Sequence, residues 1–317
     1  MEVRGIDGAA PEARDRRVRR AWILFAVAVA MWAATVVGYL IVRPEDAGNW
    51  GSSSLVANVP FLLMVLSFDV VGVMIATRRP GNSIGWIILA IGFSWSAGDI
   101  VGGLSSIGID RGWPGADILE AVLQPLWAPP IALSAIYLIL LFPDGHLPSP
   151  RWRPFAWAVA IGIVLACVAI LFLPGTFADT GHPDISNPLA IEALRGPLSV
   201  LLGALLVIPV GMIGAAVALV RRYRRSRGIE RQQMKWLAFS AAIVALAYAT
   251  VMPLSLLHME GATPRWLLAL QNVSLATFAL IPIAIGFAVL KHRLYDIDVV
   301  INKTIVFGAL ALFIGAV

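Results

Sequence analysis

Charged residues are scarce in this chain. Of its 317 residues only 14% are charged, while 59% are hydrophobic, and the mean hydropathy is +0.83. A typical soluble domain has about 25% charged residues. This composition excludes an ordinary soluble fold and indicates that lipid surrounds most of the protein.

Cysteine is almost absent as well. The single cysteine, Cys167, lies within a hydrophobic run, which excludes a disulfide framework and a thiolate metal site. His182, Asp184 and Glu192 share one loop, but their spacing is not that of a metal-binding motif. We therefore expect neither a metal nor another cofactor.

Long apolar runs are present instead. Crossing the roughly 30 Å hydrocarbon core of a bilayer takes about 20 mostly apolar helical residues. Runs near this length lie at 21–42, 55–77, 84–107, 118–142, 155–173, 197–220, 236–257 and 266–290. A further run, 304–317, has 14 residues and stops too early to cross. We predict an all-α polytopic transmembrane helix bundle with eight complete spans and a truncated ninth.

The basic residues support this count and indicate an orientation. Short cytoplasmic loops are enriched in Lys and Arg. With the N-terminus inside, the inner segments hold 20 of the 24 basic residues. We predict a multi-pass cell-membrane protein with a cytoplasmic N-terminus. Its expected parts are a disordered basic tail (1–20), an eight-span membrane domain (21–290), a cytoplasmic interfacial connector (291–303) and the start of the ninth span (304–317).

The densest basic segment is 221–235. Clustered arginines can neutralise nucleic-acid phosphates. This cluster follows an apolar run directly, however, where lipid headgroups and membrane insertion already favour positive charge. We expect contact with membrane lipids and no nucleic-acid partner; a docking surface for a cytoplasmic domain is the alternative.

Four of the polar residues within the apolar runs are candidates for a functional role. Asp69 lies near mid-bilayer, where a carboxylate is costly unless it faces protein or water, so it is a candidate functional group. The alternative is a structural acid, protonated or hydrogen-bonded to a neighbouring serine. Asp99, Glu120 and Gln124 lie at a more exterior level, by the 1.5 Å rise per helical residue. They are candidates for one outward-facing polar pocket, or else ordinary interfacial residues.

Prolines interrupt four of the predicted spans: Pro125, Pro129, Pro130, Pro209, Pro253 and Pro282. Each removes a backbone donor and tends to kink its helix, which can form a hinge or the edge of a cavity. Gly98 and Gly102 have the spacing that permits close helix approach. We predict kinked helices in these spans and helix packing at the two glycines.

The inner loop after the fourth run carries a Pro-Asp-Gly turn sequence around Asp144. We predict an ordered cap at the membrane surface. Asp144 and His146 could form an acid–base pair, but no nucleophile or third partner accompanies them, so we do not expect catalysis. Arg151 and Trp152 are typical of an interfacial anchor.

The connector after the eighth run has an ambiguous pattern. Leu294, Ile297 and Ile301 recur at helical spacing, whereas Tyr295, Ile297 and Val299 alternate as in a strand. We favour a short interfacial helix. Its candidate signal-coupling residues are Arg293, Tyr295, Asp296, Asp298 and Asn302.

Four inner segments carry recognisable motifs: RRPGNSIGW at 78–86, LFPDGHLPSPRWR at 141–153, GIERQQMKW at 228–236 and HRLYDIDVVINKT at 292–304. As a set they resemble the multi-helix N-terminal membrane region of actinobacterial sensor histidine kinases and their kinase-less relatives. The resemblance covers nearly the whole chain beyond residue 20. In that family the membrane region is followed by a dimerising helix pair with a phospho-accepting histidine and by an ATP-binding domain.

The resemblance implies the sensory and anchoring membrane region of a two-component signalling protein. None of the kinase elements occurs in these 317 residues, and none of the histidines lies in an H-box context: His146, His182, His258 and His292. The expected partners are a second copy of the chain and a cytoplasmic signalling domain or response regulator, reached through segments beyond residue 317.

Two alternatives remain open at this level. A small-solute or ion-coupled transporter would use Asp69 as its cation or proton site, although we find no convincing inverted repeat and few midplane charges. A kinase-less membrane scaffold is the other alternative.

Overall fold

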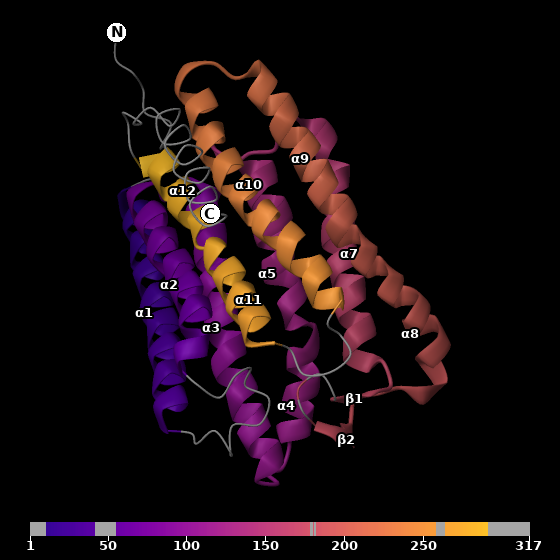
Figure 1. Cartoon of the computed structure of the whole chain (residues 1–317). Coiled ribbons are helices and arrows are strands. Elements are labelled where there is room, and N and C mark those ends of the chain that lie inside the picture. Colours follow the sequence, from indigo (N-terminus) through magenta and orange to yellow (C-terminus); the bar gives the residue numbers. More distant parts are fainter. Residues whose placement is uncertain (1–10, 42–54, 178–179, 181, 258–263, 291–317) are drawn as a thin grey trace, which may run out of the picture.

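The computed structural model describes residues 11–41, 55–177, 180, 182–257 and 264–290. The structure is 85% helical, which confirms the all-α class. The helices run alternately between two ends of a bundle (Figure 1). We call the end with residues 79–82, 142–149 and 226–227 the basic end, and the end with residues 111–115 and 173–194 the hairpin end.

Three long helices begin the bundle: α1 (Pro11–Ile41), α2 (Leu55–Arg78) and α3 (Ser83–Asp110). The start of α1 corrects the sequence prediction, because residues 11–20 are helical and not a disordered tail. Proline loses no hydrogen bond at the first helical position, and Glu12 in the first turn interacts favourably with the helix dipole. Arg17 Nη1 also donates to Pro80 O at 3.4 Å, which ties this segment to the α2–α3 turn.

Glycines bring α2 and α3 into close contact. A Cβ on Gly85 would lie 2.5 Å from the backbone nitrogen of Ala76, and a Cβ on Gly92 would overlap the Asp69 carboxylate. The predicted packing role of Gly98 and Gly102 is wrong, because an added Cβ at either would meet nothing within 4 Å. The close approach therefore lies nearer the basic end than the sequence spacing suggested.

The fourth span is divided into five short elements: α4 (Ala116–Leu123), the 3₁₀-helix η2 (Gln124–Trp127), α5 (Ala128–Ala132), the π-helix η3 (Leu133–Tyr137) and α6 (Leu138–Leu141). Pro129 has no N–H to donate to Pro125 O. That carbonyl accepts instead from the Ala128 N–H and, at 3.5 Å, from Cys167 Sγ. The predicted interruption by proline is thus present in this span.

The fifth span leads into a small sheet. It consists of η4 (Pro150–Trp152) and α7 (Arg153–Phe172), and it is followed by β1 (Thr176–Phe177), β2 (His182–Ser186) and η6 (Glu192–Leu194). The two strands pair antiparallel. His182 Nε2 lies 3.3 Å from Asp110 Oδ1, which fixes the hairpin against the end of α3. The sequence predicted only a loop here.

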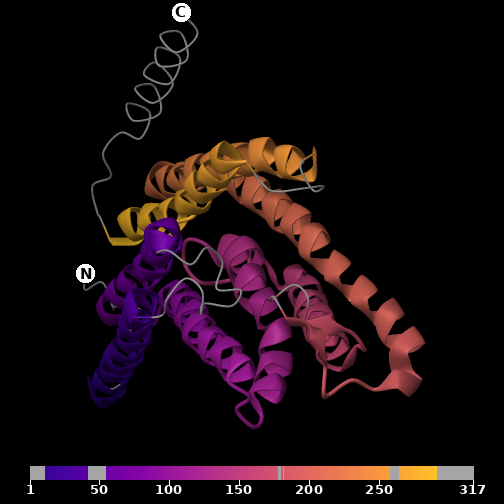
Figure 2. The same ribbon diagram turned by 60° about the horizontal axis from the view of Figure 1, so that its bottom comes forward.

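The remaining helices are α8 (Arg195–Leu201), η7 (Leu202–Leu206), α9 (Val207–Arg225), α10 (Gly228–Leu257), α11 (Arg265–Thr277) and α12 (Leu280–Leu290). Viewed from the hairpin end, α10, α11 and α12 form a layer along one side of the bundle (Figure 2). α10 continues through residue 253, since a helix can bend at proline without ending.

Proline does divide the last span. Pro282 cannot donate to the Phe278 carbonyl, which accepts instead from the Ile281 N–H at 3.1 Å. The Ala279 N–H likewise donates only three residues back, to Ala276 O at 3.1 Å. The result is a break between α11 and α12 at residues 278–279.

Apolar helices of membrane-crossing length account for most of the structure. Within the described ranges they are Glu12–Ile41, Asn58–Arg78, Ser83–Asp110, Ala116–Leu141, Pro150–Phe172, Glu192–Arg225 and Trp266–Leu290. α10 covers the predicted span 236–257 in addition. The protein is membrane-embedded; the count of eight spans and the cytoplasmic N-terminus stay predictions. The predicted connector and ninth span lie outside the described residues.

The main core lies where α2, α3, α6, α10 and α12 meet. Its fully buried side chains include Phe68, Ile88, Leu138, Leu237 and Ile285. On the outside, large apolar side chains are exposed, such as Leu206, which is 68% exposed. Exposed apolar area on this scale is typical of a lipid-facing surface.

Candidate functional site

A cavity of about 340 Å³ lies in the half of the bundle near the hairpin end. Tyr39 comes from the last turn of α1, Asn58 from the first turn of α2 and Glu120 from α4. The other lining residues are Phe61, Gly98, Asp99, Gly102, Gly103, Ser106, Thr180 and Leu275. Because Tyr39, Asn58 and Glu120 lie near the hairpin end of their helices, the cavity is closer to the hairpin end than to the basic end.

The cavity lining is acidic. Asp99 and Glu120 contribute two carboxylates, and the described lining residues include no Lys or Arg. Glu120 Oε2 accepts a hydrogen bond from Ser105 Oγ. The hydroxyl of Ser106 is buried and has no hydrogen-bond partner. A buried polar atom without a partner is costly, so this hydroxyl lowers the local stability of the bundle.

A second cavity, of about 250 Å³, adjoins the first at Phe61, Gly98 and Asp99. Trp95 and Trp127 line it, and aromatic faces attract cations. Gly98 and Gly102 have no side chain, and this leaves the space that the cavities occupy. The larger cavity has the volume typical of small-molecule sites, about 300 Å³ or more.

The structure brings together two of the four intramembrane polar candidates. Asp99 and Glu120 line one cavity, whereas Gln124 is half-buried and is not among its lining residues. Tyr39, Asn58, Ser106 and Thr180 come from other parts of the chain. Sequence reasoning missed them because uncharged polar residues near helix ends are common in any membrane protein.

Asp69 lies apart from both cavities. Its side chain is completely buried, and Oδ2 accepts a hydrogen bond from Ser96 Oγ at 3.3 Å. Oδ1 has no hydrogen-bond partner, and the absence of a Cβ at Gly92 leaves room for it. The serine contact is the one expected of a structural acid.

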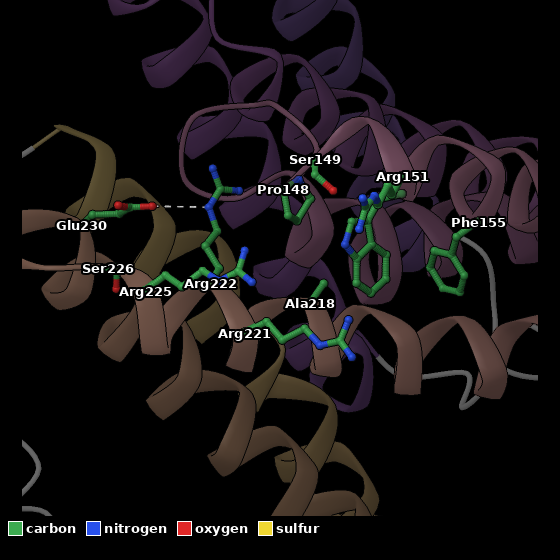
Figure 3. A pocket seen from close by; sticks show the side chains of 11 residues that line it. Pro148, Ser149, Arg151, Phe155, Ala218, Arg221, Arg222, Arg225, Ser226 and Glu230 are labelled. Atoms are coloured by element: carbon green, nitrogen blue, oxygen red, sulfur yellow. Dashed lines mark hydrogen bonds and ion pairs between the residues drawn. The ribbon is translucent and has the colours of Figure 1, made fainter.

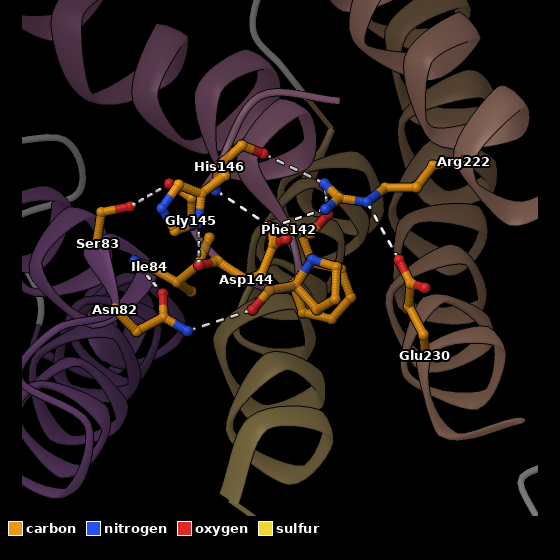
Figure 4. Close-up of polar contacts among 10 residues, drawn as sticks. Asn82, Ser83, Ile84, Phe142, Asp144, Gly145, His146, Arg222 and Glu230 are labelled. Atoms are coloured by element: carbon orange, nitrogen blue, oxygen red, sulfur yellow. Dashed lines mark hydrogen bonds and ion pairs between the residues drawn. The ribbon is translucent and has the colours of Figure 1, made fainter. Parts of the chain in front are cut away.

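A hydrogen-bond network centred on Arg222 joins the loops at the basic end (Figure 4). Nη2 of Arg222 donates to Asp144 Oδ1 at 2.7 Å, and Nη1 donates to the carbonyls of Phe142 at 2.8 Å and His146 at 3.3 Å. Nε donates to Glu230 Oε1 at 3.3 Å. The Arg222 side chain is only 14% exposed, so one guanidinium links the loop after α6 to the start of α10.

The same loop is also bonded to the α2–α3 turn. Asn82 Nδ2 donates to Pro143 O at 3.3 Å, and Ser83 Oγ donates to Gly145 O at 2.8 Å. Gly145 has φ +81°, and a Cβ there would lie 2.6 Å from Ser83 Oγ. Glycine is thus required at residue 145 both by the positive φ and by the lack of space for a Cβ. Asn82 also caps α3 by accepting from the Ile84 N–H at 2.9 Å.

These contacts exclude an acid–base pair of side chains at Asp144 and His146. The His146 ring Nδ1 lies 3.0 Å from the backbone carbonyl of Asp144, while the Asp144 carboxylate accepts from Arg222 and from the His146 N–H. The loop is an ordered cap whose carboxylate is used for tertiary bonding. Arg151 and Trp152 follow the loop and line a pocket that Arg222 and Glu230 also border.

Sequence reasoning missed the central residue of this network. Arg222 is one of seven basic residues in 221–235, and nothing in the pattern distinguishes it from Arg221 or Arg224. The motifs at 78–86, 141–153 and 228–236 lie far apart in the sequence, and their residues meet in space. The fourth motif, with Arg293, Tyr295, Asp296, Asp298 and Asn302, lies outside the described residues.

The geometry thus comprises an acidic cavity near one end and a bonded set of loops at the other. Comparisons of the chain with family models, with curated proteins and with solved structures gave no match.

Proposed function

We propose that this chain is the membrane sensory and anchoring region of a signalling protein. In this proposal the hairpin end faces outward and its acidic cavity receives a small cationic or hydrogen-bond-donating molecule. The basic end faces the cytoplasm and transmits the conformational change caused by binding to an output domain. The resemblance of the basic-end motifs to sensor histidine kinases favours a kinase as that output.

One observation carries the proposal. Leu275 of α11 lines the acidic cavity, and α11 leads through the break at 278–279 into α12, which ends at Leu290 next to the predicted connector. At the basic end, Gln233 of the 228–236 motif donates to Ala288 O of α12 at 2.6 Å. A ligand that displaced Leu275 would therefore act on the helix that leads to the connector.

A ligand can shift the conformation only by binding one arrangement better than the other. The first test is therefore binding. Purified protein is screened by thermal shift against organic cations, namely tetramethylammonium, choline, putrescine and spermidine. We expect at least one to raise the melting temperature, and Asp99→Asn to weaken its binding roughly tenfold, as loss of a charged hydrogen bond would. Asp117→Asn, on α4 but outside the cavity lining, is the matched control.

The second test measures coupling. A fluorophore is attached at Arg293→Cys in a Cys167→Ser background, and its emission is followed during titration with the cation found above. A shift that Asp99→Asn abolishes supports sensing. Binding without any change at the connector would count against it, as would a connector-deletion variant of the full-length protein that inserts and signals normally.

A transporter is distinguished by a third measurement. Asp69, buried with one unpartnered oxygen, is the group that ion coupling would use. Proteoliposomes are assayed for uptake of the same cation with the wild-type chain and with Asp69→Asn. If the wild-type chain takes up the cation and Asp69→Asn does not, transport is a better proposal than sensing.

A further inference from the structure

A pocket of about 590 Å³ lies at the basic end between the start of α7 and the end of α9 (Figure 3). Its lining holds four arginines and one acid: Arg151, Arg221, Arg222, Arg225 and Glu230. Pro148, Ser149, Trp152, Phe155, Ala218 and Ser226 complete the wall. The pocket therefore carries a net positive charge.

The sequence positions explain this concentration of charge. Arg221 and Arg225 are four residues apart and so project from one face of α9, and the end of a helix favours cations through its dipole. Arg151 comes from η4, which precedes α7. Trp152 and Phe155 pack edge to face, with ring centroids 5.4 Å apart, and form an apolar wall beside the charges.

Most of the positive charge in this pocket is not neutralised. Glu230 and Asp144 both bind Arg222. In the described part of the chain, Arg151, Arg221 and Arg225 form no ion pair or hydrogen bond through their guanidinium groups. Ser149 and Ser226 add hydroxyl groups to the same lining. Convergent arginines with free donors are the arrangement that binds phosphate.

We propose that this pocket binds a negatively charged phosphate group. Arg151, Arg221 and Arg225 donate the hydrogen bonds that hold it. The apolar wall and the adjoining spans favour the headgroup of an anionic phospholipid over a free phosphate. Basic pockets between transmembrane helices on the cytoplasmic side are a recurrent form of lipid site. The inference does not depend on the proposed signalling role.

The test is a thermal-shift titration of the full chain in detergent. The probes are dioctanoyl phosphatidylglycerol, sodium phosphate and zwitterionic dioctanoyl phosphatidylcholine. The pocket variant carries Arg151→Gln, Arg221→Gln and Arg225→Gln. The control carries Arg153→Gln, Arg224→Gln and Arg227→Gln, which remove the same charge from neighbouring positions outside the pocket lining.

We expect wild-type protein to bind phosphatidylglycerol more tightly than phosphatidylcholine. The pocket variant should lose at least about tenfold in affinity, since each arginine near an anionic headgroup contributes about fivefold. The control should lose clearly less affinity than the pocket variant, because its three arginines do not line the pocket. If the triple variant fails to fold, Arg221→Gln and Arg225→Gln are titrated singly.

The probes separate the two sources of phosphate. Binding of phosphatidylglycerol that sodium phosphate does not reproduce identifies a lipid headgroup, whereas arginine-dependent binding of sodium phosphate identifies a soluble phosphate. Equal losses in the pocket and control variants would overturn the proposal, because binding would then follow net charge alone. Equal affinity for both lipids, or no binding of any probe, would overturn it too.

Discussion

At the scale of the single residue, the Arg222 side chain donates hydrogen bonds to four different acceptors. Its guanidinium serves two carboxylates and two backbone carbonyls. Planar geometry and fixed charge suit arginine to such a branched role, and lysine would not reproduce it. The residue therefore fixes the relative position of loops that lie about eighty positions apart in the sequence.

We predict that Arg222→Gln destabilises the protein by about 2 kcal/mol or more, because the partly buried carbonyls and acids lose a charged donor. The measurement is thermal or chemical unfolding in detergent. Arg224→Gln, an exposed neighbour on the same helix, is the control and should leave stability nearly unchanged. Equal effects of the two substitutions would mean that the network contributes little.

At the same scale, the sequence predicted that Asp99 and Glu120 share one cavity, but it did not predict which other residues line that cavity. The rise per helical residue gives the depth of Asp99 and Glu120 along their separate helices, and it predicts that the two lie at a similar level. The same depth argument includes Gln124, which lies outside the cavity lining because the direction of a side chain depends on helix rotation. In this span the 3₁₀-helix η2, which contains Pro125, alters that rotation.

At the scale of the element, α3 has two different glycine environments. Near the basic end Gly85 and Gly92 touch α2, and toward the hairpin end Gly98 and Gly102 border open space. Spacing alone cannot separate these cases, since whether a neighbour fills the site depends on how α1, α2 and α4 surround α3. The sequence spacing accordingly selected the wrong pair for packing.

We predict that Gly92→Ala lowers stability by about 1–3 kcal/mol, the usual range for overpacking, because the added methyl group overlaps the Asp69 carboxylate. Gly102→Ala on the same helix should leave the unfolding midpoint almost unchanged, since an added Cβ has free space there. Unfolding midpoints in detergent give the comparison. A larger loss at Gly102 than at Gly92 would contradict the packing described.

At the scale of the whole molecule, hydrophobic runs predicted most of the helices. The apolar runs correspond to helices because backbone groups in lipid must be paired within the segment. Two features escaped detection for physical reasons. Residues 11–20 are polar yet favour helix through propensity and their contact with Pro80, and the β1–β2 hairpin is too short to leave a repeating pattern.

The orientation of the bundle is testable with single cysteines. In a Cys167→Ser background, Arg79→Cys and Arg227→Cys report on the basic end, and Gly112→Cys and Asp184→Cys report on the hairpin end. With intact cells and a membrane-impermeant maleimide, we expect labelling at residues 112 and 184 only, because basic loops stay inside. Labelling of residues 79 and 227 instead would invert the topology and place the acidic cavity toward the cytoplasm.

The break between α11 and α12 limits the kind of motion that the last span can carry. An unbroken helix transmits a push along its axis like a piston, but the hydrogen-bond ladder is interrupted at residues 278–279. Under the proposed function, a displacement of Leu275 would therefore tilt α12 sideways about this joint, and the tilt would break the hydrogen bond from Gln233 to Ala288 O near the far end of α12. Leu290 would therefore move sideways, across the axis of α12, and not along that axis.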